Sequence, residues 1–214
     1  MIVNSADQIL NDPKFIVLEG VNGAGKSTLQ RKIKEHFESS GHNVVCTREP
    51  GPETKLGKTL RKVILESEPG TLSEIAELFL FSSDRNQHVR EIIKPALERG
   101  EVVLCDRYFY SSIAFQGYGR GIDLDKIERI SAIAIEDTLP DLVILLDLDP
   151  EVGLKRNNNA DLVETDAFEK EDLAFQHRIR DGFLEIAKKY DQPFVVIDAS
   201  QSPEKVWEDT KAYL

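Results

Sequence analysis

A glycine-rich segment near the N-terminus has the residue types and spacing of a phosphate-binding loop. Residues 20–27 read GVNGAGKS and match the pattern G-x-x-x-x-G-K-[ST]. Glycines let the backbone curl so that successive N–H groups point inward, and a lysine at this position can reach the β- and γ-phosphates of a nucleotide. The pattern therefore predicts a nucleotide-binding loop made of Gly20, Val21, Asn22, Gly23, Ala24, Gly25, Lys26, Ser27 and Thr28.

A second chemical group is expected beside this loop, on a strand that runs parallel to the one before it. The apolar run 101–105 ends in Asp106, and in a parallel sheet the carboxyl end of that strand would lie near the loop. Carboxylate and hydroxyl oxygens are ligands that Mg²⁺ prefers. The sequence therefore predicts that Ser27 and Asp106 hold Mg²⁺ or its water molecules.

The elements that must position these groups alternate along the chain. Apolar, strand-like runs lie at 15–19, 43–47, 101–105, 142–148 and 194–198. Helix-like stretches lie at 27–38, 55–65, 73–87, 89–98, 124–137, 170–189 and 202–213. Alternation of this kind predicts an α/β fold with a parallel sheet covered on both faces. We expect an N-terminal extension at 1–14 and one domain at 15–214, with a polar lid at about 153–172.

Composition narrows the classes of partner. The chain has 214 residues and a formal net charge of −11, whereas proteins that hold nucleic-acid polymers usually carry a basic surface. The longest apolar runs are far shorter than the roughly 20 residues that cross a bilayer, and residues 1–13 lack the pattern of a secretory signal. Cys46 and Cys105 lie in apolar runs and are expected to be buried thiols. We expect a cytoplasmic protein that binds neither a membrane nor a nucleic-acid polymer.

The loop alone does not name a substrate, because several protein classes share it. Switch GTPases need an Asn-Lys-x-Asp motif, and no Asn-Lys pair occurs in this sequence. Their Asp-x-x-Gly motif is also absent after the second motif strand, where the chain has Asp106, Arg107 and Tyr108. These absences exclude the switch GTPases.

Four segments, one of which contains the loop, resemble those of bacterial thymidylate kinases, and the resemblance covers nearly the full length. They are FIVLEGVNGAGKS at 15–27, TREPG at 47–51, LFSSDR at 80–85, and DRYFYSSIAFQG with GRGID at 106–123. The resemblance implies a three-layer P-loop nucleoside-monophosphate kinase fold with a five-stranded parallel sheet of order 2-3-1-4-5. It also implies a homodimer that phosphorylates dTMP to dTDP with Mg·ATP, in the biosynthesis of dTTP.

The same resemblance gives roles to residues of the acceptor pocket. It places Phe81 against the face of thymine and Arg85 at the base carbonyl O4. Ser112 and Gln116 would contact the N3–H edge, and Phe115 would pack against C2′ of the sugar. A donor aimed at O4 disfavours cytosine, because cytosine carries an amino group there.

Three arginines match family positions near phosphate. Arg48, Arg61 and Arg107 would approach the acceptor phosphate or the transferring group, since the planar guanidinium fork suits phosphate oxygens. The acceptor oxygen is already anionic, so no strong general base is required. Catalysis would rest on positioning and on charge neutralisation.

The sequence departs from the family pattern at two places. Asn22 is expected to bind the acceptor, and it stands where the family usually has an acidic residue that contacts the sugar 3′-hydroxyl or the metal. The arginine that relatives place in the loop or in the lid is also missing, since no arginine occurs between Arg156 and His177. Arg156 is the nearest candidate to replace it, so the predicted catalytic set is Lys26, Arg107 and Arg156. Two alternatives stay open: a kinase for another pyrimidine deoxynucleoside monophosphate, and a nucleotide-binding module with impaired catalysis.

Overall fold

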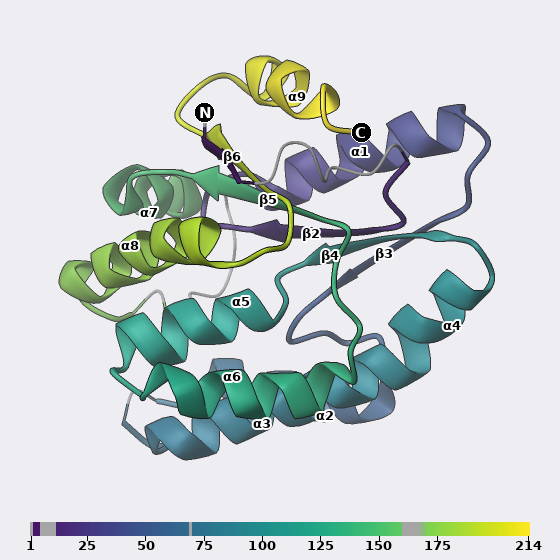
Figure 1. The fold of residues 1–214 in the computed structure, drawn as a ribbon. Coiled ribbons are helices and arrows are strands. Elements are labelled where there is room, and N and C mark those ends of the chain that lie inside the picture. Colours follow the sequence, from purple (N-terminus) through teal and green to yellow (C-terminus); the bar gives the residue numbers. More distant parts are fainter. Residues whose placement is uncertain (1, 5–11, 69, 160–167, 169) are drawn as a thin grey trace.

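The computed structural model describes residues 2–4, 12–68, 70–159, 168 and 170–214, and residues 2–4, 158 and 159 by their backbone only. A single sheet runs through the middle of the molecule, with strands in the order β1-β6-β5-β2-β4-β3 (Figure 1). The strands are β1 (Ile2–Asn4), β2 (Phe15–Glu19), β3 (Val44–Arg48), β4 (Val102–Asp106), β5 (Leu142–Asp147) and β6 (Phe194–Asp198).

The five strands from β2 to β6 are parallel, which confirms the expected fold. Counted in chain order from β2 and read from the β3 edge, they stand in the order 2-3-1-4-5. Every residue of β2 is buried, as is nearly all of β4 and β5. Continuous apolar runs are what a strand covered on both faces requires.

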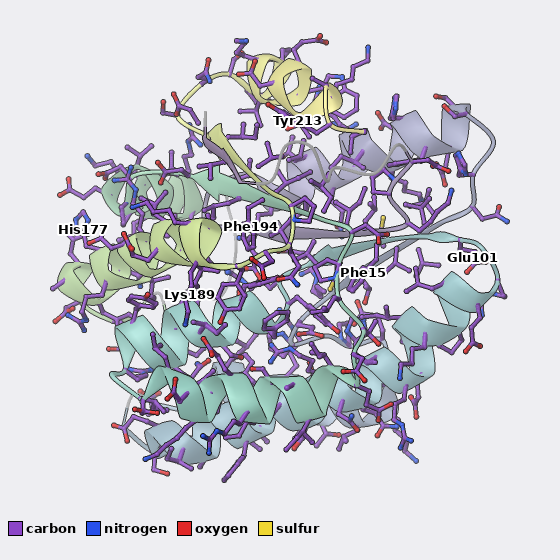
Figure 2. All side chains as sticks on the ribbon, viewed as in Figure 1. Phe15, Glu101, His177, Lys189, Phe194 and Tyr213 are labelled. Carbon is purple, nitrogen blue, oxygen red and sulfur yellow. The ribbon has the colours of Figure 1, made fainter. Side chains whose placement is uncertain are left out.

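Helices cover both faces of the sheet, with α1 and α9 on one side and a larger group that includes α2, α3 and α6 on the other (Figure 1). Side chains fill the space between these layers, and Phe15 and Phe194 lie within it (Figure 2). The α-helices are α1 (Lys26–Ser39), α2 (Lys55–Glu66), α3 (Glu74–His88), α4 (Lys94–Glu98), α5 (Phe109–Ser112), α6 (Leu124–Ile135), α7 (Pro150–Asn159), α8 (Leu173–Lys189) and α9 (Pro203–Lys211), and two π-helical segments are η2 (Val89–Ile93) and η3 (Ile113–Gly119).

Two features of the sheet edges were not expected from the sequence. Residues 2–4 of the N-terminal segment form β1, which pairs antiparallel with β6, Ile2 opposite Val196. Cys105 is buried as expected, whereas Cys46 is exposed. Cys46 lies on the edge strand β3, where an apolar residue is not necessarily buried by neighbouring strands and helices.

The carboxyl ends of the parallel strands bring the chemical groups together. Leu18 and Arg48 are both in register with Asp106, so the ends of β2, β3 and β4 meet at one edge. Ligands of open parallel sheets bind outside this edge. Among the described residues, no helix combines the length and the apolar character needed to cross a membrane. Residues 160–167 and 169 of the predicted lid lie outside the described part, so the lid stays a prediction.

Candidate nucleotide-binding site

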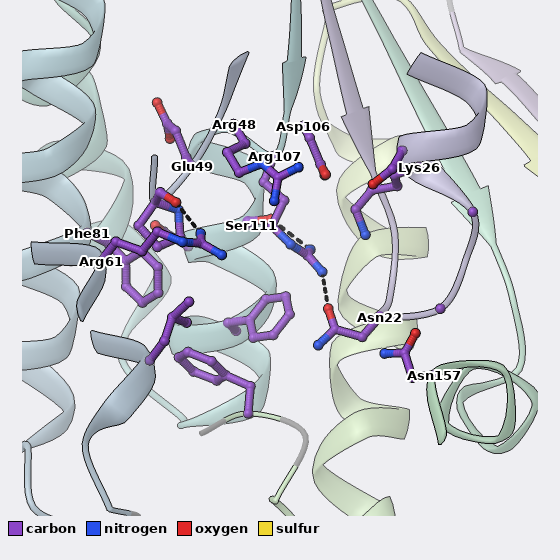
Figure 3. A pocket seen from close by; sticks show the side chains of 18 of the residues that line it. Asn22, Lys26, Arg48, Glu49, Arg61, Phe81, Asp106, Arg107, Ser111 and Asn157 are labelled. Carbon is purple, nitrogen blue, oxygen red and sulfur yellow. Dashed lines mark hydrogen bonds between the residues drawn. The ribbon is translucent and has the colours of Figure 1, made fainter. Parts of the chain in front are cut away.

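A cavity of about 490 Å³ opens at the carboxyl ends of the strands and collects most of the predicted site (Figure 3). All nine residues expected to bind the acceptor line it, together with both predicted metal ligands. Gly23, Gly25, Lys26, Ser27 and Thr28 of the loop also line it, whereas Val21 and Ala24 are buried behind. A cavity lined by six basic side chains concentrates positive potential in a protein of net charge −11.

The phosphate-binding loop packs closely on α7 because each of the two segments has a glycine at the point of contact. Gly23 has a φ of 76°, a conformation that residues with a Cβ rarely adopt. A Cβ on Gly23 would collide with the backbone of Gly153 on α7, and one on Gly153 would meet the carbonyl oxygen of Asn22 at less than normal contact distance. The tip of the loop therefore packs directly on α7, which fixes where the phosphates of a nucleotide would lie.

Lys26 lies folded over the loop that it follows. Its Nζ donates to the carbonyl oxygens of Gly20 and Val21, each at 3.2 Å, and the residue is buried. Lys26 begins α1, where backbone N–H groups lack helical acceptors and attract anions. An ammonium at this position can move by rotation of its stem onto the phosphates of a bound nucleotide.

Asp106 offers an oxygen suited to a metal ion or its water. Oδ1 is buried and has no hydrogen-bond partner among the residues that the structure describes. Buried carboxylate oxygens without a partner are rare because desolvating them costs free energy. Ser27 lines the same cavity. The two predicted ligands thus fit a Mg²⁺ site.

Arg107 connects the loop to the acceptor side of the cavity. Its Nη2 donates to Asn22 Oδ1 at 2.6 Å, and its Nη1 donates to the Gly20 carbonyl at 3.0 Å (Figure 3). The guanidinium also lies over the ring of Phe115, 5.0 Å from the centroid. The amide oxygen of Asn22 therefore accepts from this arginine.

Three aromatic rings form the apolar wall of the cavity, and the sequence predicted two of them. Phe81 on α3 and Phe115 on η3 both contact Phe168, with centroids 5.8 and 5.3 Å apart. Phe168 is buried and lines the cavity. Flat apolar surfaces of this kind suit a nucleobase and its sugar. Phe168 gave no signal in the sequence, because it lies in a polar stretch without clear periodicity.

The polar edge of the same wall is built by Arg85 and Ser112. The Arg85 guanidinium is buried and donates to Ser112 Oγ at 3.0 Å. Gln116 lies one helical turn beyond and donates through its side-chain amide to Glu77 at 2.8 Å. This donation leaves the amide carbonyl of Gln116 as an acceptor for a ligand N–H.

Arg48 and Arg61 stand where an anion would be held. Arg48 is exposed at the end of β3, and its guanidinium has neither a hydrogen bond nor an ion pair with any described residue. Arg61 on α2 donates to the Pro50 carbonyl. Both side chains line the cavity, and the planar fork of a guanidinium suits phosphate oxygens.

A second cavity of about 340 Å³ lies on the other side of the loop. Arg156 lines both cavities, and its Nη1 donates to the Ala199 carbonyl at 3.0 Å, in the segment between β6 and α9. Gln201 and Pro203 also line the second cavity. The contact with Ala199 holds the Arg156 guanidinium toward the second cavity, and its expected catalytic role stays a prediction.

Two buried carboxylates support the site and were assigned no role from the sequence. Glu19 accepts from the backbone N–H of Tyr108 and from the N–H and hydroxyl of Ser111, and burial raises its pKa to about 7. These bonds hold the turn that carries Arg107, a non-glycine residue with φ of 72°. Glu49 pairs with Arg85, with Nε and Oε2 2.7 Å apart.

A third buried carboxyl, Asp84, should make stability depend on pH. Burial, followed by the nearby charge of Glu49, raises its pKa from 3.8 to about 7. Between these values the unfolded chain is ionised while the folded protein stays protonated. The free energy of unfolding therefore falls as pH rises toward 7. From pH 5.5 to 8.5 this contribution is about 2 kcal/mol, at roughly 1.4 kcal/mol per pH unit.

Asp84→Asn removes that contribution. The amide can still accept from the Gly51 N–H that Asp84 Oδ2 contacts. We expect the free energy of unfolding of the variant, relative to that of the wild type, to be about 2 kcal/mol higher at pH 8.5 than at pH 5.5. Urea unfolding at both pH values measures the difference. A variant whose unfolding free energy runs parallel to wild type across this range would contradict it.

Comparisons with known proteins agree on one family. The family model of thymidylate kinase matches residues 18–210. The chain is 42% identical over 203 residues to the thymidylate kinase of Maridesulfovibrio salexigens, which covers 92% of this chain and 93% of that protein. It is 45% identical over 192 residues to that of a Synechococcus strain, which covers 90% and 89%.

A solved structure agrees with these sequence relatives. The crystal structure of thymidylate kinase from Ehrlichia chaffeensis superposes with a TM-score of 0.74 at 32% identity, and the match covers 92% of this chain and 96% of that one. The residues that line the two cavities all fall within the range 18–210 that the family model matches.

Proposed function

The chain belongs to the thymidylate kinase family, and we propose that its two cavities bind the two nucleotides of that reaction. The protein phosphorylates dTMP to dTDP with ATP as the donor, a step in the biosynthesis of dTTP. The observation that carries the assignment to the cavities is the convergence of all nine expected acceptor contacts on the cavity of about 490 Å³.

dTMP occupies this larger cavity, with its base between the aromatic wall and Arg85. Phe81 stacks on thymine, and Arg85 donates to O4. The Gln116 carbonyl, freed by the bond from its amide to Glu77, accepts from N3–H. Phe115 is packed by Phe168 and Arg107, so it leaves no room for a 2′-hydroxyl on the sugar.

ATP lies across the loop, with its nucleoside in the second cavity. Residues of the loop line both cavities, so a triphosphate bound along the loop extends from one cavity into the other. Ser27 and Asp106 would hold Mg²⁺, which would neutralise part of the negative charge of the triphosphate. The partnerless oxygen of Asp106 supports this assignment.

The chain's own residues bring about transfer by position and charge. Arg48 and Arg61 hold the acceptor phosphate so that one of its oxygens faces the γ-phosphorus. That oxygen forms the new P–O bond as the bond to the β–γ bridging oxygen breaks, and ADP leaves. Lys26 and Arg107 neutralise the charge that develops on the transferring group.

The protein forms a homodimer and acts in the cytoplasm. Support for the dimer comes from large apolar side chains that remain exposed on neighbouring helices. Phe79 on α3 is 53% exposed and Ile133 on α6 is 77% exposed. Leu56 and Val63 on α2 are also exposed, and α2, α3 and α6 form the outer layer on one side of the sheet (Figure 1).

Release of ADP with different acceptors tests the function and its specificity. We expect dTMP to be the best acceptor, dUMP weaker, and dCMP and UMP poor. With dCMP, the donors of Arg85 would face an amino group instead of a carbonyl oxygen. With UMP, the ring of Phe115 would meet an additional 2′-hydroxyl. Both mismatches weaken binding of the transition state. A coupled assay with Mg·ATP measures kcat/KM for each. Equal values for dTMP and dCMP would remove this account of the pocket.

A further inference from the structure

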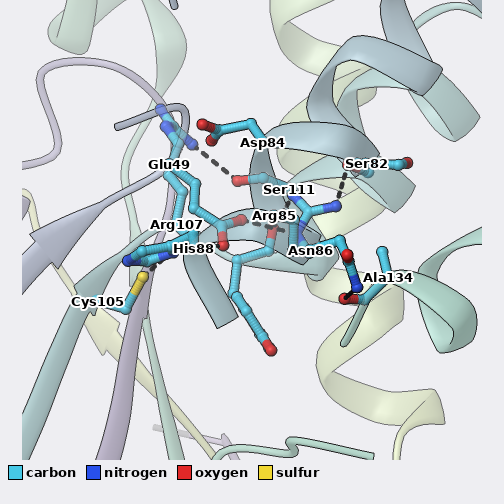
Figure 4. Close-up of polar contacts among 12 residues, drawn as sticks. Glu49, Ser82, Asp84, Arg85, Asn86, His88, Cys105, Arg107, Ser111 and Ala134 are labelled. Carbon is cyan, nitrogen blue, oxygen red and sulfur yellow. Dashed lines mark hydrogen bonds and ion pairs between the residues drawn. The ribbon is translucent and has the colours of Figure 1, made fainter. Parts of the chain in front are cut away.

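A series of buried polar side chains stands behind the guanidinium of Arg85 (Figure 4). Arg85 Nε donates to Glu49 Oε2 at 2.7 Å. The other oxygen of Glu49 lies 2.9 Å from His88 Nδ1, and His88 Nε2 lies 2.6 Å from Thr47 Oγ1. The series thus runs from the end of β3 through α3 to the wall of the acceptor cavity.

The central ion pair of this series has almost no access to solvent. The side chains of Arg85 and Glu49 are each 1% exposed, and that of His88 is 3% exposed. A charge buried this deeply must be paired, because removing one partner leaves an uncompensated charge in a medium of low polarity. Glu49 therefore holds Arg85 in place more strictly than a surface partner would.

The contacts of Arg85 also decide which of its N–H groups can face a ligand. Glu49 takes the single N–H on Nε. Ser112 Oγ takes one from Nη1, and the Tyr108 carbonyl takes one from Nη2. A guanidinium has five N–H groups, two on each Nη. One donor is left on each Nη, and the residue lines the acceptor cavity.

His88 orients Glu49 in turn. A neutral imidazole with the proton on Nδ1 donates to Glu49 and accepts from the Thr47 hydroxyl, so both ring nitrogens are satisfied. Cys105 lies beside this pair, and one ligand atom of each of the three residues falls within 4.8 Å of the others. Both imidazole nitrogens of His88 and both carboxylate oxygens of Glu49 already have hydrogen-bond partners. These side chains therefore serve as parts of a hydrogen-bond network and not as metal ligands.

We propose that Glu49, oriented by His88 and Thr47, is a positioning residue that determines the base specificity of the acceptor site. It fixes the guanidinium of Arg85 so that the remaining N–H groups face a carbonyl oxygen at position 4 of a pyrimidine. The inference rests on the proposed function, in which Arg85 contacts that oxygen. Glu49 also lines the cavity, but both its carboxylate oxygens are bonded to Arg85 and His88, so its effect on the base is exerted through Arg85.

Glu49→Gln tests the proposal with little change of shape. Its amide offers one acceptor oxygen to two donors, Arg85 Nε–H and His88 Nδ1–H, so one of them loses its partner. Because a hydrogen bond to a charged group is lost, we expect kcat/KM for dTMP to fall about 10- to 100-fold. The value for dCMP should change less than about threefold, and the KM for ATP less than about twofold.

Two variants of His88 test the same series without changing the ion pair. His88→Asn places an amide N–H where Nδ1 lies, and His88→Leu removes the donor. We expect His88→Asn to keep the dTMP to dCMP ratio within about twofold of wild type, whereas His88→Leu lowers it about 3- to 10-fold, as loss of one hydrogen bond would. This pair carries the test if Glu49→Gln fails to fold.

Asp84→Asn is the matched control, because Asp84 is a buried carboxyl next to Arg85 in the chain but makes no hydrogen bond with the Arg85 side chain; its own bond is to the Gly51 N–H. It should leave the ratio unchanged. Equal losses for dTMP and dCMP in Glu49→Gln, or a ratio that His88→Leu does not change, would overturn the proposal while the proposed function stands. A wild-type protein that does not prefer dTMP over dCMP would overturn both.

Discussion

Lys26→Ala should lower kcat for transfer to dTMP by at least about 10³-fold, with both substrates saturating. The Lys26 ammonium bonds two carbonyl oxygens of the loop, so it stands at the one place where it can exchange them for phosphate oxygens. Residues 20–28 and 157–172 contain no arginine, so a larger share of the charge neutralisation falls on Lys26. Single-turnover measurement of ADP formation reports the effect on the chemical step.

The control for this prediction lies on the same helix. Lys34→Ala removes a lysine two turns further along α1, which pairs with Glu38 away from both cavities. It should leave kcat unchanged. Because the residue at 26 is buried, Lys26→Met, which keeps most of the aliphatic stem, separates loss of charge from loss of packing. Near-normal turnover in Lys26→Met would show that the loop does not hold the transferring phosphate.

Most of the residues that line the cavity of about 490 Å³ could be predicted because phosphate and base binding require particular residue types at particular spacings. A curled backbone, an ammonium and a hydroxyl must follow one another within eight residues, so the loop at 20–27 is visible in the sequence. Phe81 and Arg85 are four residues apart and therefore share a helical face. The order of the parallel strands followed from the family resemblance.

The residues that support the site could not be found in this way. Glu19 ends an apolar strand, and Glu49 begins a turn. Nothing in the spacing of these residues shows that Glu19 will be buried against the hydroxyl of Ser111, or Glu49 against Arg85. Phe168 reaches the cavity from a polar segment. Contacts across 36 to 92 residues, as between Glu49 and Arg85 or between Glu19 and Ser111, depend on tertiary packing alone.

The edges of the sheet were obscure for a related reason. The strand β1 is three residues long and pairs with β6 on one side only. Such a short run carries no periodicity. Cys46 follows two valines and resembles a core residue, yet an edge strand leaves part of its surface open to solvent. Local pattern predicts that a strand exists, and only the strand order decides which residues are covered.

Arg107→Ala should lower kcat by about 10³-fold and should exceed the effect of Arg156→Ala on the same constant. The Arg107 guanidinium is bonded to the loop at Gly20 and Asn22 and lies over Phe115, between the loop and the proposed site of the acceptor. Its backbone, held by the turn that Glu19 binds, has a φ of 72° that few residues other than glycine adopt.

The comparison with Arg156 decides which arginine replaces the one missing from the loop and the lid. Its guanidinium donates to the Ala199 carbonyl beside the second cavity, where the nucleoside of ATP is proposed to lie. Arg156→Ala should therefore raise the KM for ATP and change kcat less than about tenfold, because a contact made equally in the ground and transition states affects binding more than rate. Arg99→Ala, which removes an exposed arginine paired with Glu101, is the control. If kcat falls further in Arg156→Ala than in Arg107→Ala, then Arg156 must leave Ala199 during the reaction and contact the transferring phosphoryl group itself.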